Sequence, residues 1–177
     1  CHCLVGSEMC IRDRLNGGLK KWIKEIRITT SDLPQINTSK YKSLEKKELV
    51  KDMKMINQNI IKPSFKVVDA RSRERFEGRV AEPRKGLKSG NIKNSFCIPF
   101  GSCLNEDKTF KDVDELKKIF HSCLNDIVDK NIVFSCGSGV TACVLALAYS
   151  LINDKYLPCI YDLSLIHIWR CRRSERW

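Results

Sequence analysis

The chain has 177 residues and lacks long apolar runs, since no stretch reaches the length that a membrane span needs. Its first residues hold no basic region followed by an apolar core, so we expect no signal peptide. Its ten cysteines include no CxxC pair and no metal-finger spacing. We therefore expect no metal, no other cofactor and no membrane association. Reduced thiols in the cytoplasm or the mitochondrion are favoured over a secreted disulfide framework, which stays the alternative.

Aromatic residues make up only 8% of the chain and do not alternate with basic residues, although the formal net charge is +11. A stacking platform for nucleic acid needs aromatic rings set between basic contacts. The lysines are scattered, and many of them fall in residues 40–62. We therefore expect no nucleic-acid partner. The positive charge fits a solvated basic surface, and it is also consistent with a small anionic substrate.

The two ends of the chain, residues 1–14 and 163–177, lack clear periodicity and helix caps. Together they carry four of the ten cysteines, and both resemble translated adapter sequences from sequencing libraries. We treat them as non-native and leave them out of the fold prediction, as is done for expression scars.

Strand-like runs alternate with helical patterns in the middle of the chain, which predicts an α/β fold with a mainly parallel central sheet flanked by helices. The expected strands are 65–69, 96–99, 131–134 and 158–161. The expected helices are a short amphipathic one within 15–26, one over 44–57 capped by Ser43 with a stripe of Leu44, Val50, Met53 and Ile56, a brief one over 72–76, one capped by Asp112 with a face of Val113, Leu116, Ile119 and Phe120, and one over 142–152. Residues 77–90 are expected to be loop, and ligands of such folds bind beyond the carboxyl ends of the strands.

The most informative feature is a cysteine between a buried strand and a helix. Cys136 is followed by Gly-Ser-Gly and then by the apolar run 142–152. Backbone N–H groups and a helix N-terminus converge at such a turn and favour the thiolate over the thiol. We therefore expect Cys136 to be a nucleophile in an anion-binding loop. The cysteines at other strand and helix positions are expected to be small apolar fillers: Cys97, Cys103, Cys123, Cys143 and Cys159. Cys143 is the most interesting exception, because it lies one helical turn beyond the loop.

Two separated segments carry a family resemblance. The segment VVDARSRERFEGRVAEPRKGLKSGNIKNSFCIPF, followed by VFSCGSGVTA, resembles the C-terminal catalytic domain of two-domain rhodanese-like sulfurtransferases. The loop CGSGVTA has the form seen in 3-mercaptopyruvate sulfurtransferases, whereas thiosulfate sulfurtransferases carry basic residues there. The likeness implies an incomplete catalytic domain over 64–162. It also implies the tail of a preceding rhodanese domain over 15–26 and an interdomain linker over 27–63.

The resemblance implies roles for individual residues. Cys136 would carry the sulfur as a persulfide, and Ser138 would act with it in catalysis. The other loop residues would bind substrate through hydroxyl groups and inward amides: Gly137, Gly139, Val140 and Thr141. Arg75 and Arg84 match two arginines that hold the carboxylate of the donor, a task that suits the planar guanidinium.

Asp69 and Arg71 look structural and tie the end of a strand to the loop region. The chain also departs from the family pattern at several positions. The family usually has His at Asn91, Pro-Gly at Lys93-Asn94, Asn at Cys97 and Gly at Leu163. Its preceding domain is thought to supply an Asp and a His that work with the loop serine, and neither can be assigned in this chain.

The expected function is transfer of sulfane sulfur from 3-mercaptopyruvate, or thiosulfate, to cyanide or to a thiol such as thioredoxin or a small thiol. A catalytically inactive fragment or binding module is the alternative. A Cys-loop phosphatase is disfavoured, because it needs a longer loop that ends in Arg. For Arg75 and Arg84, a plain ion pair with Glu74, Glu77 or Glu82 stays open. His121 lies on a helix without a metal partner at suitable spacing.

Overall fold

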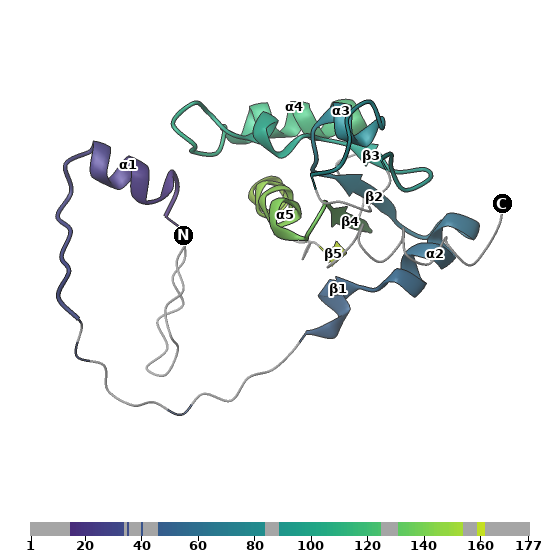
Figure 1. The fold of residues 1–177 in the computed structure, drawn as a ribbon, viewed down its shortest axis with the longest axis horizontal. Coiled ribbons are helices and arrows are strands. Elements are labelled where there is room, and N and C mark those ends of the chain that lie inside the picture. The colour runs from purple at the N-terminus through teal and green to yellow at the C-terminus, as the bar shows by residue number, and fades with distance from the viewer. Residues whose placement is uncertain are drawn as a thin grey trace.

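A five-stranded sheet with all strands parallel forms the centre of the fold (Figure 1). The computed structural model describes residues 15–33, 35, 40, 46–83, 89–124, 131–153 and 159–161. The strands lie in the order β1-β5-β4-β2-β3, with bounds β1 Val50–Lys51, β2 Lys66–Asp69, β3 Phe96–Cys97, β4 Ile132–Ser135 and β5 Cys159–Tyr161. The predicted α/β class with a parallel sheet is confirmed.

The helices alternate with the strands in the chain from β1 onward, and one α-helix precedes β1. They are α1 Gly18–Lys24, α2 Met53–Ile61, α3 Arg73–Phe76, α4 Val113–Leu124 and α5 Val140–Ile152, with short 3-10 helices at Lys47–Leu49 and Phe100–Cys103. Asp112 accepts a hydrogen bond from the amide of Glu115 at 2.8 Å, so the predicted cap of α4 is confirmed. Asp52 caps α2 in the same way through the amide of Met55.

Helices α4 and α5 pack on one face of the sheet. Side chains alternate along a strand, so Ile132 and Phe134 of β4 point to this face. The rings of Phe120, Phe134 and Tyr149 lie with their centroids 5.3 to 6.3 Å apart. This aromatic cluster fixes α4 and α5 against β4, the strand that leads into Cys136.

Helix α2 covers the opposite face. Its Ile56 is fully buried against Val67 of β2, Val133 of β4 and Tyr161 of β5. Burial raises the pKa of the Tyr161 hydroxyl above its ordinary value, and the charge of Asp52 adds to the effect. The sheet is therefore covered on both faces, as a parallel sheet requires.

The helix prediction over 44–57 is wrong in position. Residues 47–49 form a 3-10 turn, Val50–Lys51 pairs with β5, and the helix begins at Met53. The intended cap Ser43 lies outside the described residues. The apolar period from Val50 to Ile56 comes from a short edge strand followed by a helix. Val50 of the strand is 51% exposed, and the helix buries Ile56. Elements that the sequence placed in the linker thus pack on the sheet.

The short helix α1 is present as expected and is attached to the segment before α4. Asn16 accepts a hydrogen bond from the amide of Phe110 at 3.0 Å, and the Lys21 ammonium lies 3.2 Å from an Asp107 carboxylate oxygen. Hydrogen bonds from Thr109, with help from Lys21, lower the pKa of Asp107 to about 2. Helix α1 is otherwise exposed, and among the described residues it buries no side chain in the core.

Candidate active site

Cys136 lies directly after β4, at the carboxyl edge of the sheet, as predicted. Its side chain is 1% exposed, and the amide of Ser138 donates a hydrogen bond to the Cys136 Sγ at 3.4 Å. Gly139 has φ +85° and is the N-cap of α5. A left-handed conformation costs an L-residue with a side chain, so glycine suits this turn. The turn directs the amide of Ser138 at the sulfur.

The other predicted loop residues follow Cys136 directly in the chain. Gly137, Ser138 and Thr141 are half-buried, and Thr141 lies in the first turn of α5. Val140 is 70% exposed as the first residue of α5. The roles assigned to Ser138, Thr141 and Val140 in catalysis and substrate binding stay predictions.

Arg75 of α3 reaches the cysteine loop from another part of the chain. A Cβ on Gly137 would lie 3.2 Å from Arg75 Nη2, so the missing side chain of the glycine gives the guanidinium its place. Arg75 also forms an ion pair with Glu82, at 2.5 Å between Nη2 and Oε2. Of the three acids that the sequence left open as partners, Glu82 is the one that the structure selects.

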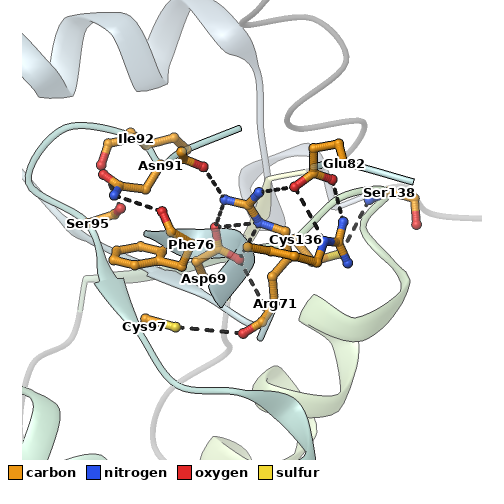
Figure 2. A network of polar contacts seen from close by, with 12 residues as sticks. Asp69, Arg71, Phe76, Glu82, Asn91, Ile92, Ser95, Cys97, Cys136 and Ser138 are labelled. Atoms are coloured by element: carbon orange, nitrogen blue, oxygen red, sulfur yellow. Dashed lines mark hydrogen bonds and ion pairs between the residues drawn. The ribbon is translucent and has the colours of Figure 1, made fainter. Parts of the chain in front are cut away.

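Arg71 is a second arginine in the network of polar contacts near the cysteine loop (Figure 2). Arg71 is 1% exposed and binds both Asp69 oxygens through Nε, with Nη2 at 2.7 Å from Oδ2. Its Nη2 also donates to the Gly90 carbonyl at 2.7 Å, and its Nη1 donates to Glu82 at 2.6 Å. Asp69 and Arg71 are therefore structural, as the sequence analysis expected.

Ion pairs in this network stabilise the charged forms of Arg71 and Glu82, although both side chains are buried. Burial disfavours the charge of Arg71, but the hydrogen bonds and charges of Asp69 and Glu82 outweigh it and raise the pKa of Arg71. Burial likewise raises the pKa of Glu82, while Arg75 and Arg71 together lower it by more. Arg71 and Glu82 therefore each stabilise the charge of the other beside the loop.

Arg84, the second arginine predicted to hold the donor, lies outside the described residues. Glu82 was missed as a member of the site and appeared only as one of three candidate ion-pair partners. The chain position of Glu82, two residues before Arg84 in the segment AEPR, is the sequence signal that could have identified it.

The turn before β3 is formed by residues at which the chain departs from the family pattern. The amide of Ser95 donates to the Ile92 carbonyl, which closes a turn with Lys93 and Asn94 at its centre. Asn94 has φ +62°, and asparagine tolerates this left-handed conformation better than most residues. Asn91, at a position where the family has His, donates to the Phe76 carbonyl at 3.0 Å and ties this turn to α3.

The remaining described cysteines are not joined in disulfides, and they lie in different environments. Cys97 and Cys103 are buried, and burial is the main cause that raises the pKa of each to about 11. Cys143 is exposed, one helical turn beyond Gly139, and its thiol lies 3.4 Å from the Gly139 carbonyl. Burial also raises the pKa of the half-buried Cys123. The expectation of buried fillers therefore fits Cys97 and Cys103 but not Cys143.

In the described part of the chain, no three His, Cys, Asp or Glu side chains gather as metal ligands, and no helix is long and apolar enough to cross a bilayer. A surface cavity of about 470 Å³ lies between the end of α2 and the start of β2. It is lined by Met55 and Phe65 among others, at the amino edge of the sheet, so it does not adjoin Cys136.

A parallel sheet with a cysteine loop at its carboxyl edge, between a buried strand and a helix, fits a rhodanese-like fold. Comparisons with known proteins agree, and the chain carries a domain of the rhodanese-like sulfurtransferase family. It is 43% identical over 115 residues to a thiosulfate/3-mercaptopyruvate sulfurtransferase of Arabidopsis thaliana, covering 64% of this chain and 30% of the relative. It is 32% identical over 161 residues to human 3-mercaptopyruvate sulfurtransferase, covering 91% and 54%.

Solved structures show the same architecture. SseA of Escherichia coli, described with the rhodanese fold of 3-mercaptopyruvate sulfotransferases, superposes with a TM-score of 0.69 at 26% identity, over 83% of this chain and 53% of SseA. EanB superposes with a TM-score of 0.77 over 92% of this chain and 39% of EanB; at 18% identity this supports the fold alone. No model of a protein family matches the chain. The chain spans about half the length of the human relative.

Proposed function

We propose that this domain transfers a sulfur atom from a small anionic donor to a thiol or to cyanide through a persulfide on Cys136. The observation that carries the proposal is the thiol after β4, with the Ser138 amide directed at its sulfur and the Arg75 guanidinium against the same loop. The amide donors stabilise a sulfur anion, and the guanidinium binds an anionic group.

In the first half-reaction, the Cys136 thiolate attacks the sulfur of 3-mercaptopyruvate. The new S–S bond forms as the carbon–sulfur bond breaks, and its electron pair leaves on the enolate of pyruvate, which then takes up a proton. In the second half-reaction, an acceptor thiolate attacks the outer sulfur and leaves as a persulfide, so that Cys136 returns as a thiolate. Covalent catalysis in two halves predicts ping-pong kinetics.

The preferred donor is 3-mercaptopyruvate rather than thiosulfate. Relatives carry both names, so the family alone does not decide between these donors. The loop residues Gly137, Ser138 and Gly139 are uncharged, and dianionic thiosulfate would find no loop cation there. Arg75, together with Arg84, is proposed to bind the single carboxylate of mercaptopyruvate. No metal or organic cofactor takes part in this chemistry.

The proposed acceptor is a small thiol or a thioredoxin, whose thiol reaches the outer persulfide sulfur. The Arabidopsis relative named above is described as mitochondrial. We place the parent protein in the mitochondrion or the cytoplasm on that basis and on the reduced thiols.

A binding module without activity is the second candidate, because the chain spans only about half the length of its relatives. Pyruvate release from 3-mercaptopyruvate, with dithiothreitol as acceptor, separates the two. We expect turnover that is abolished in the Cys136→Ser protein. The Cys143→Ser protein is the control, because Cys143 is an exposed cysteine one helical turn beyond the loop, and it should keep its turnover. Turnover that persists in the Cys136→Ser protein would refute the mechanism. A folded chain without any turnover would favour the binding module.

A further inference from the structure

Glu82 is a buried carboxylate that joins the structural arginine to the arginine at the cysteine loop. Its side chain is 2% exposed, and it pairs with both Arg71 and Arg75. Oε1 accepts from Arg71 Nη1 at 2.6 Å, and Oε2 accepts from Arg75 Nη2 at 2.5 Å. Since Arg71 is itself held by Asp69 and the Gly90 carbonyl, Glu82 connects Arg75 to a rigid, buried anchor.

The geometry decides which side of Arg75 is used. A guanidinium has two edges that can bind a carboxylate by parallel bonds, one formed by Nε and Nη2 and the other by Nη1 and Nη2. Glu82 binds the first edge, with Nε at 3.3 Å from Oε1 and Nη2 at 2.5 Å from Oε2. Within the described residues, no acceptor binds Nη1 of Arg75. The second edge is therefore available to a ligand beside Gly137.

Arg75 and Arg71, the two arginines that Glu82 connects, differ in how far they are exposed to solvent. The Arg75 side chain is 29% exposed, whereas Arg71 is 1% exposed and Glu82 is 2% exposed. An arginine side chain that is partly exposed loses considerable rotamer entropy when a ligand fixes it. A buried carboxylate that already fixes one edge removes most of that cost before the ligand arrives.

We propose that Glu82 is a positioning residue, which holds Arg75 by its Nε/Nη2 edge and so leaves the Nη1/Nη2 edge for a carboxylate at the Cys136 loop. This inference rests on the proposed function only in taking the donor to be a carboxylate. It predicts that Glu82 favours carboxylate binding although its own charge is negative, because orientation outweighs the repulsion between the two anions.

The test compares two alkylating probes of similar size, iodoacetate with a carboxylate and neutral iodoacetamide. Both form a thioether at Cys136 with loss of iodide, and peptide mass spectrometry measures each rate at this residue in the full chain. The ratio of the iodoacetate rate to the iodoacetamide rate is divided by the same ratio for glutathione. We expect Glu82→Gln to lower this normalised ratio about tenfold, as the loss of a charged bidentate contact would. We expect Arg75→Gln to lower it equally.

The double variant identifies the path of the effect. If Glu82 acts through Arg75, adding Glu82→Gln to Arg75→Gln causes no further loss. Glu77→Gln, which removes an exposed acid that pairs with Arg79, is the control for net charge and should leave the ratio unchanged. A ratio that stays constant or rises in Glu82→Gln would overturn the proposal, as would an equal further loss in the Arg75→Gln background.

Circular dichroism shows whether the Glu82→Gln protein is folded. If it is unfolded, Glu82→Asp takes its place, because aspartate keeps the charge but is one methylene too short to reach both arginines. A normalised ratio below that of the wild type supports the proposal, and a ratio equal to it refutes the proposal. The alkylation ratio does not involve sulfur transfer. A chain that shows the expected ratios but forms no persulfide would therefore refute the proposed function and not the role of Glu82.

Discussion

Replacement of Arg71 by glutamine tests the account of the buried network. The guanidinium is 1% exposed and binds Asp69, Glu82 and the Gly90 carbonyl. Without it, Asp69 stays buried at 1% exposure, and of the hydrogen bonds described for its carboxylate only the one from the amide of residue 71 remains. Removal of one partner from a buried ion pair typically costs about 3 to 5 kcal/mol, because it leaves an uncompensated charge.

That loss is a large fraction of the stability of a domain of this size, about 5 to 15 kcal/mol. Urea unfolding followed by circular dichroism measures it by linear extrapolation. Arg79→Gln is the matched control, since Arg79 pairs with Glu77 at the surface and its side chain is 62% exposed. We expect the control to change the stability by less than about 1 kcal/mol. If Arg71→Gln costs no more than Arg79→Gln, the reasoning on the buried network is wrong.

Three further predictions follow from the same structure. Gly139→Ala should lower the stability by about 1 to 2 kcal/mol in urea unfolding, because φ is +85° at this position; no loss would show that the turn adapts. Burial raises the pKa of Glu82, but Arg75 and Arg71 lower it by more, to below 4.5. The stability from Glu82 is therefore present above pH 4.5 and lost as the pH falls through the folded value, so acid titration should destabilise the Glu82→Gln protein less than the wild type. Cys97 and Cys103, whose pKa burial raises to about 11, should resist iodoacetamide at pH 8 until urea unfolds the chain, whereas the exposed Cys143 should react; early labelling of Cys97 would contradict this.

Much of the fold could be predicted because its signals are local. The buried strand before Cys136 and the Asp112 cap of α4 each lie within a few residues of the element that they define. The edge strand β1 could not be predicted in this way. It has only two residues, Val50–Lys51, and exists because β5, more than a hundred residues later, offers a free edge. The burial of Val113 could not be predicted locally either. It was expected on the apolar face of α4 but is 44% exposed, because the first turn of the helix extends past the core.

The part of the site that could be predicted from the sequence is the part formed by one continuous segment. The cysteine loop is continuous, so its place beyond β4 followed from the strand and helix on either side. The network of Asp69, Arg71, Glu82 and Arg75 depends on a loop that returns to α3. The sequence offered three candidate partners for Arg75, namely Glu74, Glu77 and Glu82. It could not select Glu82, because the burial of that side chain is visible only in the structure.

The central claim is that Cys136 accepts a sulfur atom from an anionic donor. Peptide mass spectrometry of the chain after incubation with 3-mercaptopyruvate, without an acceptor thiol, tests it directly. We predict that the peptide with Cys136 gains the mass of one sulfur atom, about 32 Da, and loses it again when dithiothreitol is added. A folded chain in which Cys136 keeps its unmodified mass would contradict the account.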